Sequence, residues 1–153
     1  MVRHGCIALG TLLLALSLAA AEPGVKAQFV GGTVNGISPK ASCRLDLTHP
    51  DALLFEYGKS EIKIDYRKVN TLEYGQNVSR RYAAAVLVSP LLLLSKSRKH
   101  FITLGYLDDE GKQQALVLRV EKGDIRSVLA GLEARTGRRV EYQDDEARKS
   151  GKG

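Results

Sequence analysis

The sequence has 153 residues, of which 44% are hydrophobic and 26% are charged, and its formal net charge is +6. This length leaves no room for two ordinary domains. The mild positive charge is ordinary for solubility and also suits contact with an anionic surface.

Residues 1–21 have the pattern of a secretory signal peptide. Arg3 and His4 form a short positive start, residues 7–18 are apolar, and three alanines at 19–21 form a small-residue cleavage site. A retained membrane anchor is the alternative, but the apolar stretch is short for a span of about 20 residues. We therefore expect an exported protein, periplasmic or secreted. Removal of 21 of the 153 residues leaves a mature chain of 132.

The mature chain begins with an expected mobile leader at residues 22–28. Residues 29–34 predict a first strand, in which two adjacent glycines indicate a bulge or a sharp bend. Residues 41–48 alternate like a half-buried strand, with Cys43 on its apolar side. Cys43 would be the only cysteine of the mature chain, so no internal disulfide is expected. Its position favours a buried structural thiol over a reactive one.

Five further strands are predicted from alternating apolar and polar residues and from the turn residues between them. Together with the first two they make about seven strands, and their short connections are typical of antiparallel pairing. His100 is expected at a solvated strand end. The five strands are residues 53–57, 61–66, 69–74, 100–107 and 114–120.

The pattern then changes to the period of an amphipathic helix. Asp124 is placed to cap its first turn, and Gly137 stands where a left-handed residue ends a helix. Such a short helix must dock against the sheet to be stable. Residues 138–142 predict a last short strand, and residues 143–153 a disordered charged tail. The apolar stripe of the helix is Ile125, Val128, Leu129 and Leu132.

Residues 83–94 hold seven large aliphatic side chains, bracketed by cations. Leaving all seven in water would forgo on the order of 10–20 kcal/mol, so something must cover them. These side chains are either core of the domain or an exposed contact for a protein or a membrane. If they are core, the contact surface of the protein lies elsewhere. The residues of this expected contact surface are Arg80, Arg81, Leu91, Leu92, Leu93, Leu94, Lys96, Arg98 and Lys99.

Three phrases of the chain carry a resemblance to a known family. They are Ile62-Lys63-Ile64-Asp65-Tyr66-Arg67-Lys68-Val69 leading into Leu72-Glu73-Tyr74-Gly75, then Ser95-Lys96-Ser97-Arg98-Lys99-His100-Phe101-Ile102-Thr103-Leu104, and Leu132-Glu133-Ala134-Arg135-Thr136-Gly137.

These phrases are similar to exported, uncharacterised bacterial proteins with a pleckstrin-homology (PH)-like core, over residues 29–142. The resemblance implies a mainly β, PH-like barrel or sandwich, in which a C-terminal helix closes one corner. It implies no activity. PH domains that bind inositol lipids cluster cations on their first two strands, whereas residues 29–47 offer only Lys40 and Arg44. The resemblance therefore gives no support to inositol-lipid binding.

Catalytic and metal-binding patterns are not evident. A zinc site needs three or four ligands, and the mature chain offers only His49, His100 and Cys43, with no ligand spacing. No nucleophile elbow, phosphate-binding loop or calcium loop appears. We therefore predict no catalytic residue, no metal site and no cofactor. Nucleic acid is not an expected partner of an exported chain.

The sequence thus predicts an exported, non-enzymatic binding or scaffolding module. Its partner would be an unknown protein, an anionic membrane surface or a second copy of the chain. An enzyme of unknown type, using paired carboxylates, is the alternative from another class.

Overall fold

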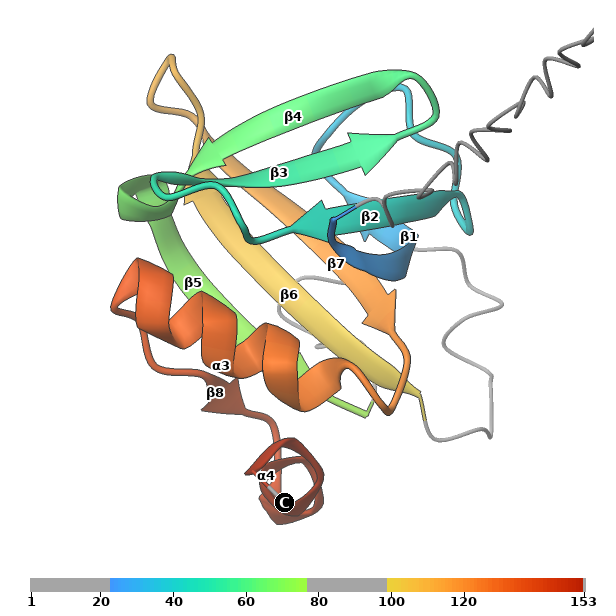
Figure 1. Ribbon diagram of the computed structural model, residues 1–153, viewed down its shortest axis with the longest axis vertical. Coiled ribbons are helices and arrows are strands. Elements are labelled where there is room, and N and C mark those ends of the chain that lie inside the picture. The colour runs from blue at the N-terminus through green and yellow to red at the C-terminus, as the bar shows by residue number, and fades with distance from the viewer. Residues whose placement is uncertain (1–22, 77–98, 153) are drawn as a thin grey trace, which may run out of the picture.

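The computed structural model describes residues 23–76 and 99–152 (Figure 1). In these two stretches eight strands form one mixed sheet, in the order β4-β3-β2-β1-β7-β6-β5-β8. Strands β4 and β8 are its edges and do not pair with each other, so the sheet is not closed. The strands are β1 (Val25–Gly32), β2 (Ser42–Asp46), β3 (Ala52–Tyr57), β4 (Ser60–Asp65), β5 (Val69–Gly75), β6 (His100–Leu107), β7 (Gln113–Val120) and β8 (Glu141–Tyr142).

The first four strands form an antiparallel meander. Alternation sets their faces: on β2, Cys43 and Leu45 are 6% and 1% exposed, whereas Arg44 between them lies on the other face. A two-residue turn at positions 58 and 59 joins β3 to β4, and Gly58 has a φ of 58°. A positive φ at the first turn position suits a tight hairpin and favours glycine.

Strand β1 is longer than expected, and the mobile leader is wrong for residues 25–28. Ala27 lies opposite Cys43 of β2 and also opposite Val120 of β7. Both edges of β1 therefore have hydrogen-bonding partners, which holds the start of the strand in place. The expected irregularity in β1 is confirmed by a register shift between Phe29 and Gly31.

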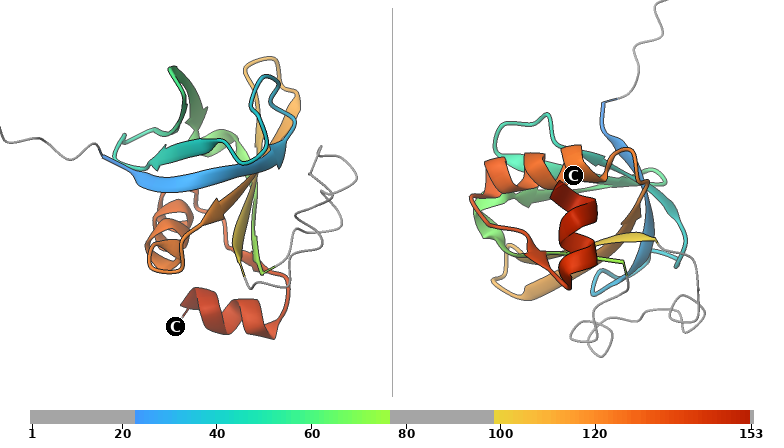
Figure 2. Two further views of the ribbon diagram at one scale, coloured as in Figure 1. Left: turned by 90° about the vertical axis from the view of Figure 1, so that its right-hand side faces the viewer. Right: turned by 90° about the horizontal axis from the view of Figure 1, so that it is seen from below.

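The second half of the sheet contains β5, β6 and β7 as an antiparallel meander, with β7 joined to β1. The predicted last short strand is confirmed as β8, but it pairs with β5 in parallel, so the sheet is mixed where antiparallel pairing was expected. Figure 2 shows that the sheet is strongly bent, so that its two halves lie at a steep angle to each other. The coarse expectation of a mainly β domain is confirmed.

Helix α3 (Ile125–Thr136) lies in the angle between the two halves of the sheet (Figure 2). Its four stripe residues are all buried in the main core cluster, as the helical period predicts. Gly137 ends the helix with a φ of 68°, and its N–H donates to Glu133 O at 2.9 Å. Asp124 stands at the start of the helix, but its side chain makes no capping hydrogen bond. That part of the prediction is wrong.

Helix α4 (Asp145–Lys152) replaces the expected disordered tail. Asp144 begins it, because Asp144 Oδ1 accepts a hydrogen bond from Ala147 N at 2.6 Å. Ala147 is completely buried, and Gly151 approaches so closely that an added Cβ would lie 2.6 Å from Tyr142 Cε1. The tail is ordered because these two small residues let the helix backbone approach an aromatic surface.

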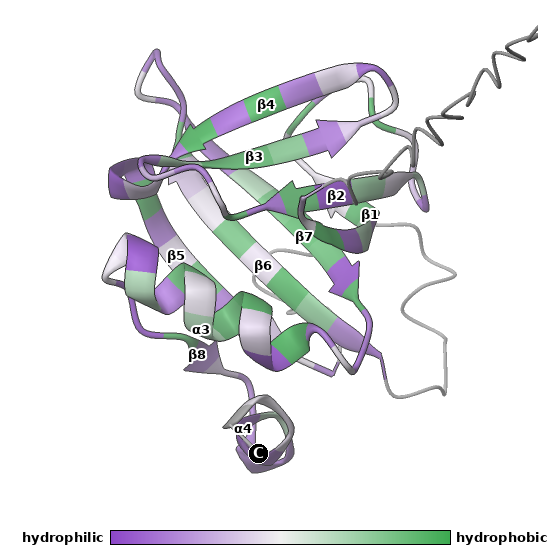
Figure 3. Ribbon diagram, viewed as in Figure 1, coloured by the Kyte–Doolittle hydropathy of each residue, from purple (hydrophilic) through white to green (hydrophobic). Residues whose placement is uncertain are grey.

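The core lies inside the bend, and Figure 3 shows strands β6 and β7 as largely apolar ribbons at its centre. Its largest fully buried members include Phe55, Tyr74 and Leu116. The outer face of the central strands is buried as well: Phe101, Thr103 and Val117 are 5%, 3% and 0% exposed. Because neighbouring residues of a strand point to opposite faces, these strands are covered on both sides.

Candidate functional site

A groove of about 460 Å³ lies beside the open edge of the sheet. We call it the edge groove. One wall is strand β4 with the start of β3, and the other is the end of β6 with the β6–β7 turn. The short helix η1 (Tyr66–Lys68) closes one end between β4 and β5. The lining residues are Asp51, Ala52, Ile62, Lys63, Ile64, Asp65, Arg67, Lys68, Tyr106, Leu107, Asp108 and Asp109.

An apolar strip runs through the edge groove. Leu107 is 39% exposed and is the one large hydrophobic residue of the described chain that is exposed. Ile62 faces the groove from β4 and is half-buried, whereas its neighbour Ile64 is fully buried. An apolar side chain of a partner would therefore be shielded from water if it packed against this strip.

Charged groups on both walls are fixed by hydrogen bonds. Arg67 donates to Asp65 through its backbone N at 2.8 Å and through Nη2 at 2.9 Å. These hydrogen bonds hold the pKa of Asp65 at about 2, against an ordinary value of 3.8. Lys68 Nζ reaches Asp109 Oδ1 at 2.6 Å and so joins η1 to the β6–β7 turn.

The β6–β7 turn is built around Asp108. Its Oδ1 accepts hydrogen bonds from the backbone N of Glu110 at 3.0 Å and of Lys112 at 2.8 Å, and Oδ2 accepts from Gln114 Nε2 at 2.8 Å. The bond from Gln114 is the main cause that lowers the pKa of Asp108. Asp65 and Asp108 are thus ionised and already hydrogen-bonded, which suits them to shape a binding surface.

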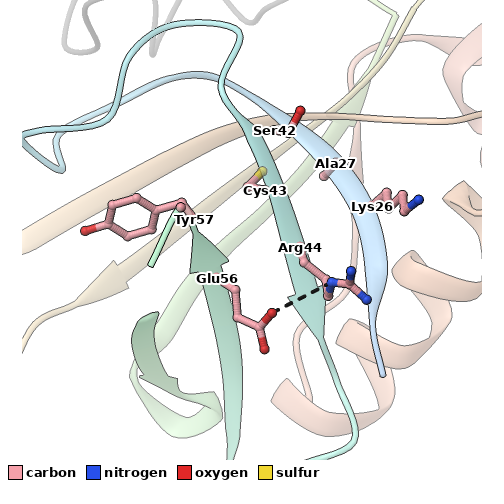
Figure 4. A pocket seen from close by; sticks show the side chains of 8 residues that line it. Lys26, Ala27, Ser42, Cys43, Arg44, Glu56 and Tyr57 are labelled. Carbon is pink, nitrogen blue, oxygen red and sulfur yellow. Dashed lines mark ion pairs between the residues drawn. The ribbon is translucent and has the colours of Figure 1, made fainter. Parts of the chain in front are cut away.

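A second hollow, of about 450 Å³, lies on strands β1, β2 and β3 (Figure 4). Arg44 Nε and Glu56 Oε2 are 3.7 Å apart across it. Cys43 contributes to its wall, but burial raises the pKa of its thiol to about 12. A thiol with that pKa stays protonated and is a poor nucleophile, as expected of a structural cysteine.

A third cluster lies where β5 ends and β6 begins. The Tyr74 hydroxyl and His100 Nδ1 are 2.5 Å apart, and their rings stack at an interplanar angle of 5°. Tyr142 packs edge-on against Tyr74. His100 is therefore half-buried and stacked, and the expectation of a solvated strand end is wrong. Burial lowers the pKa of His100, because desolvation disfavours its charged form.

The expected contact surface falls almost entirely outside the described residues. Only Lys99 lies within them; it is half-buried and directly precedes β6. The residues outside the described stretches are Arg80, Arg81, Leu91, Leu92, Leu93, Leu94, Lys96 and Arg98.

Sequence reasoning placed β4 and both of its isoleucines correctly but missed the edge groove. The missing information was which strands have a neighbour on each side, because the β1–β7 pairing joins residues that lie far apart in sequence. The one signal of the groove in the sequence was Leu107, a large apolar residue at the start of a charged turn.

Within residues 23–76 and 99–152, no three His, Cys, Asp or Glu side chains are grouped as a metal ion would require. No helix of these stretches is both long enough and apolar enough to cross a membrane. Compared with known proteins, the chain matches no family model and no curated protein.

Proposed function

We propose that this protein is an exported, non-enzymatic binding module with a PH-like fold. The fold proposal is supported by the order of the strands, which joins a four-stranded and a three-stranded meander through β1 and β7. It is supported further by α3, which packs its apolar stripe into the bend of the sheet. Export is supported by the signal-like pattern of residues 1–21.

The open edge of β4 is the observation that carries the binding proposal. Among the described strands, β4 pairs with β3 alone, and the edge groove runs alongside it. An extended segment of a partner can add to such an edge through backbone hydrogen bonds, while neighbouring pockets take alternate side chains. The strip formed by Ile62 and Leu107 would take one apolar side chain. The partner class is therefore a protein segment in extended conformation.

Proline substitution on β4 tests this proposal. Alternate residues of an antiparallel strand turn their backbone groups toward the partner strand. Counted from the Tyr57–Ser60 pair that closes the turn, the backbone N–H and C=O of Lys63 point away from β3. Lys63→Pro therefore removes an outward N–H without breaking the β3–β4 ladder, and an edge strand tolerates proline.

The wild-type protein, panned against a displayed library of random peptides, is expected to select extended peptides that Lys63→Pro no longer binds. Unfolding of Lys63→Pro at the wild-type temperature is the control for its fold. Selected peptides that bind Lys63→Pro as well as they bind the wild type would contradict binding at this edge, and so would a library that yields none.

The aliphatic stretch at residues 83–94, with its basic flanks, remains a proposed contact for a protein or an anionic membrane. Its sequence supports this proposal. The alternative that the stretch is core is supported by the buried outer face of β6 and β7, where Phe101 and Val117 are almost inaccessible.

One double variant, Leu92→Ser with Leu93→Ser, separates the two. Loss of folding indicates core. A folded variant that no longer floats with anionic vesicles, or no longer captures a protein partner, indicates a contact surface. A folded variant that binds anionic vesicles like the wild type would rule out the membrane contact.

A further inference from the structure

Two opposite charges on β4 have no partner within the described chain. Glu61 and Lys63 are both exposed, and no ion pair of the described residues includes either of them. Glu61 lies opposite Glu56 of β3, and Glu56 Oε2 is 3.7 Å from Arg44 Nε. Lys63 lies opposite Leu54. The domain therefore gives Glu61 a like charge and Lys63 an apolar neighbour.

Within residues 23–76 and 99–152 no strand pairs with the outer side of β4, which leaves the backbone of the same two residues open. Counted from the pair that closes the β3–β4 turn, residues 60, 62 and 64 bond to β3, while Glu61 and Lys63 direct their N–H and C=O outward. The backbone hydrogen bond that follows β4 agrees with this alternation, because Tyr66 N donates to Asp51 O at 3.1 Å. An incoming strand would pair with Glu61 and Lys63 first.

We propose that the occupant of this edge is β4 of a second copy of the chain, antiparallel about a two-fold axis at Ile62. This inference rests on the proposed function of the edge. In that register Glu61 lies opposite Lys63 of the second copy, Lys63 lies opposite its Glu61, and the two Ile62 side chains meet. The strand is thus self-complementary in charge.

The neighbouring registers are disfavoured by charge. Side chains of paired residues share a face, so a symmetric register that keeps Ile62 and Ile64 on the core side must place its axis at a residue. An axis at Glu61 sets the two Glu61 side chains against each other, and an axis at Lys63 does the same for lysine. Of these three axes, the one at Ile62 makes both central pairs opposite in sign, and like charges directly opposite are destabilising. An axis at Ile64 would pair Lys63 with Asp65, but Asp65 is already bound by Arg67 at 2.9 Å, whereas Glu61 has no ion pair within the described residues.

The interface is small, because it adds one short strand pair and the contact between two isoleucines. Stable dimers bury roughly 1,200 Å² or more, so this pairing would be a weak, concentration-dependent association. Ile62 and Leu107 both line the edge groove, so each copy would add an apolar side chain to the groove of the other.

Charge reversal and its reciprocal swap test the inference. Sedimentation of the full chain over about 10 μM to about 1 mM is expected to show a reversible dimer of the wild type. Lys63→Glu makes both central pairs Glu–Glu and is expected to weaken dimerisation at least tenfold. The double variant Glu61→Lys with Lys63→Glu restores both pairs and is expected to dimerise again.

Glu61→Lys alone separates association from folding. It removes the like-charge pair with Glu56 and is expected to unfold at the wild-type temperature or above, yet to stay monomeric. A monomeric wild type, a Lys63→Glu variant that dimerises normally, or a swap that does not restore dimerisation would overturn the inference. If the wild type is monomeric while β4 still binds library peptides, self-pairing is wrong and the proposed function stands. If β4 binds neither, both are wrong.

Discussion

Helix α4 is held on the domain by small residues, so a larger side chain at Gly151 is expected to release it. A Cβ at Gly151 would lie 2.6 Å from Tyr142 Cε1 and 3.3 Å from Leu129 Cδ1. The Tyr142 ring packs edge-on against Tyr74 with 6.0 Å between centroids, so it has little room to move away. Overpacking of this kind costs about 1–3 kcal/mol, and Gly151→Leu adds enough atoms to reach the upper value.

Two of the contacts that favour docking can be given a magnitude. Ala147 is fully buried, and Ser150 Oγ accepts a hydrogen bond from Gln76 Nε2 at 3.0 Å. About 1 kcal/mol for the methyl group and about 1 kcal/mol for the hydrogen bond give a docking free energy of about 2 kcal/mol. Gly151→Leu gains about 0.8 kcal/mol from the higher helix propensity of leucine, whereas the overpacking against Tyr142 costs about 3 kcal/mol. The docking free energy then falls to about zero, so about half of the molecules should have α4 undocked.

Amide hydrogen exchange measures this release. In Gly151→Leu the amides of residues 145–152 are expected to exchange at least tenfold faster, while the amides of β5, β6 and β7 keep their protection. Gly123→Leu is the matched control, because an added Cβ at Gly123 meets nothing within 4 Å. If α4 stays fully protected in Gly151→Leu, or if the whole sheet loses protection with it, the reasoning is refuted.

Three further predictions follow from the packing and the charges. Gly32→Ala places a Cβ 2.5 Å from the Ala115 carbonyl oxygen, so chemical denaturation should show a loss of about 1–3 kcal/mol. Because the pKa of Asp65 is lowered from 3.8 to about 2, its contribution to stability is present above pH 4 and is lost as the pH falls toward 2. Arg67→Gln should raise the pKa of Asp65 toward 3.8 in an NMR titration; an unchanged pKa would contradict the pairing. The Cys43 thiol, with a pKa of about 12, should resist alkylation at pH 8 until the protein unfolds, and rapid reaction of the folded protein would contradict its burial.

Local patterns predicted most of the sheet. Alternation set β2, β4 and β6 to within a residue or two of their observed bounds, and helical spacing identified all four buried residues of α3. These features depend on neighbours a few positions away, which a sequence displays directly. The same holds for Gly137, whose positive φ follows from its place after the last helical turn.

Features that depend on distant partners were missed. The start of β1 has few strong apolar residues, and it is a strand because β2 and β7 flank it. The tail is helical because Ala147 is buried in the core and Gly151 fits against Tyr74 and Tyr142, which hydropathy does not reveal. The open edge of β4 follows from the whole strand order, so the candidate site could not be located before the fold was known.

Disulfide trapping at β4 tests the central claim most directly. In a Cys6→Ser background, Ile62→Cys places one thiol on each side of the proposed two-fold axis, where directly opposite Cβ atoms are about 4.5–5.5 Å apart. Mild oxidation is expected to cross-link Ile62→Cys into a dimer, whereas Glu61→Cys or Lys63→Cys alone stays monomeric and their equimolar mixture cross-links. Cross-linking of Lys63→Cys with itself, or no cross-linking of Ile62→Cys at about 1 mM protein, would contradict the pairing of two β4 edges at Ile62.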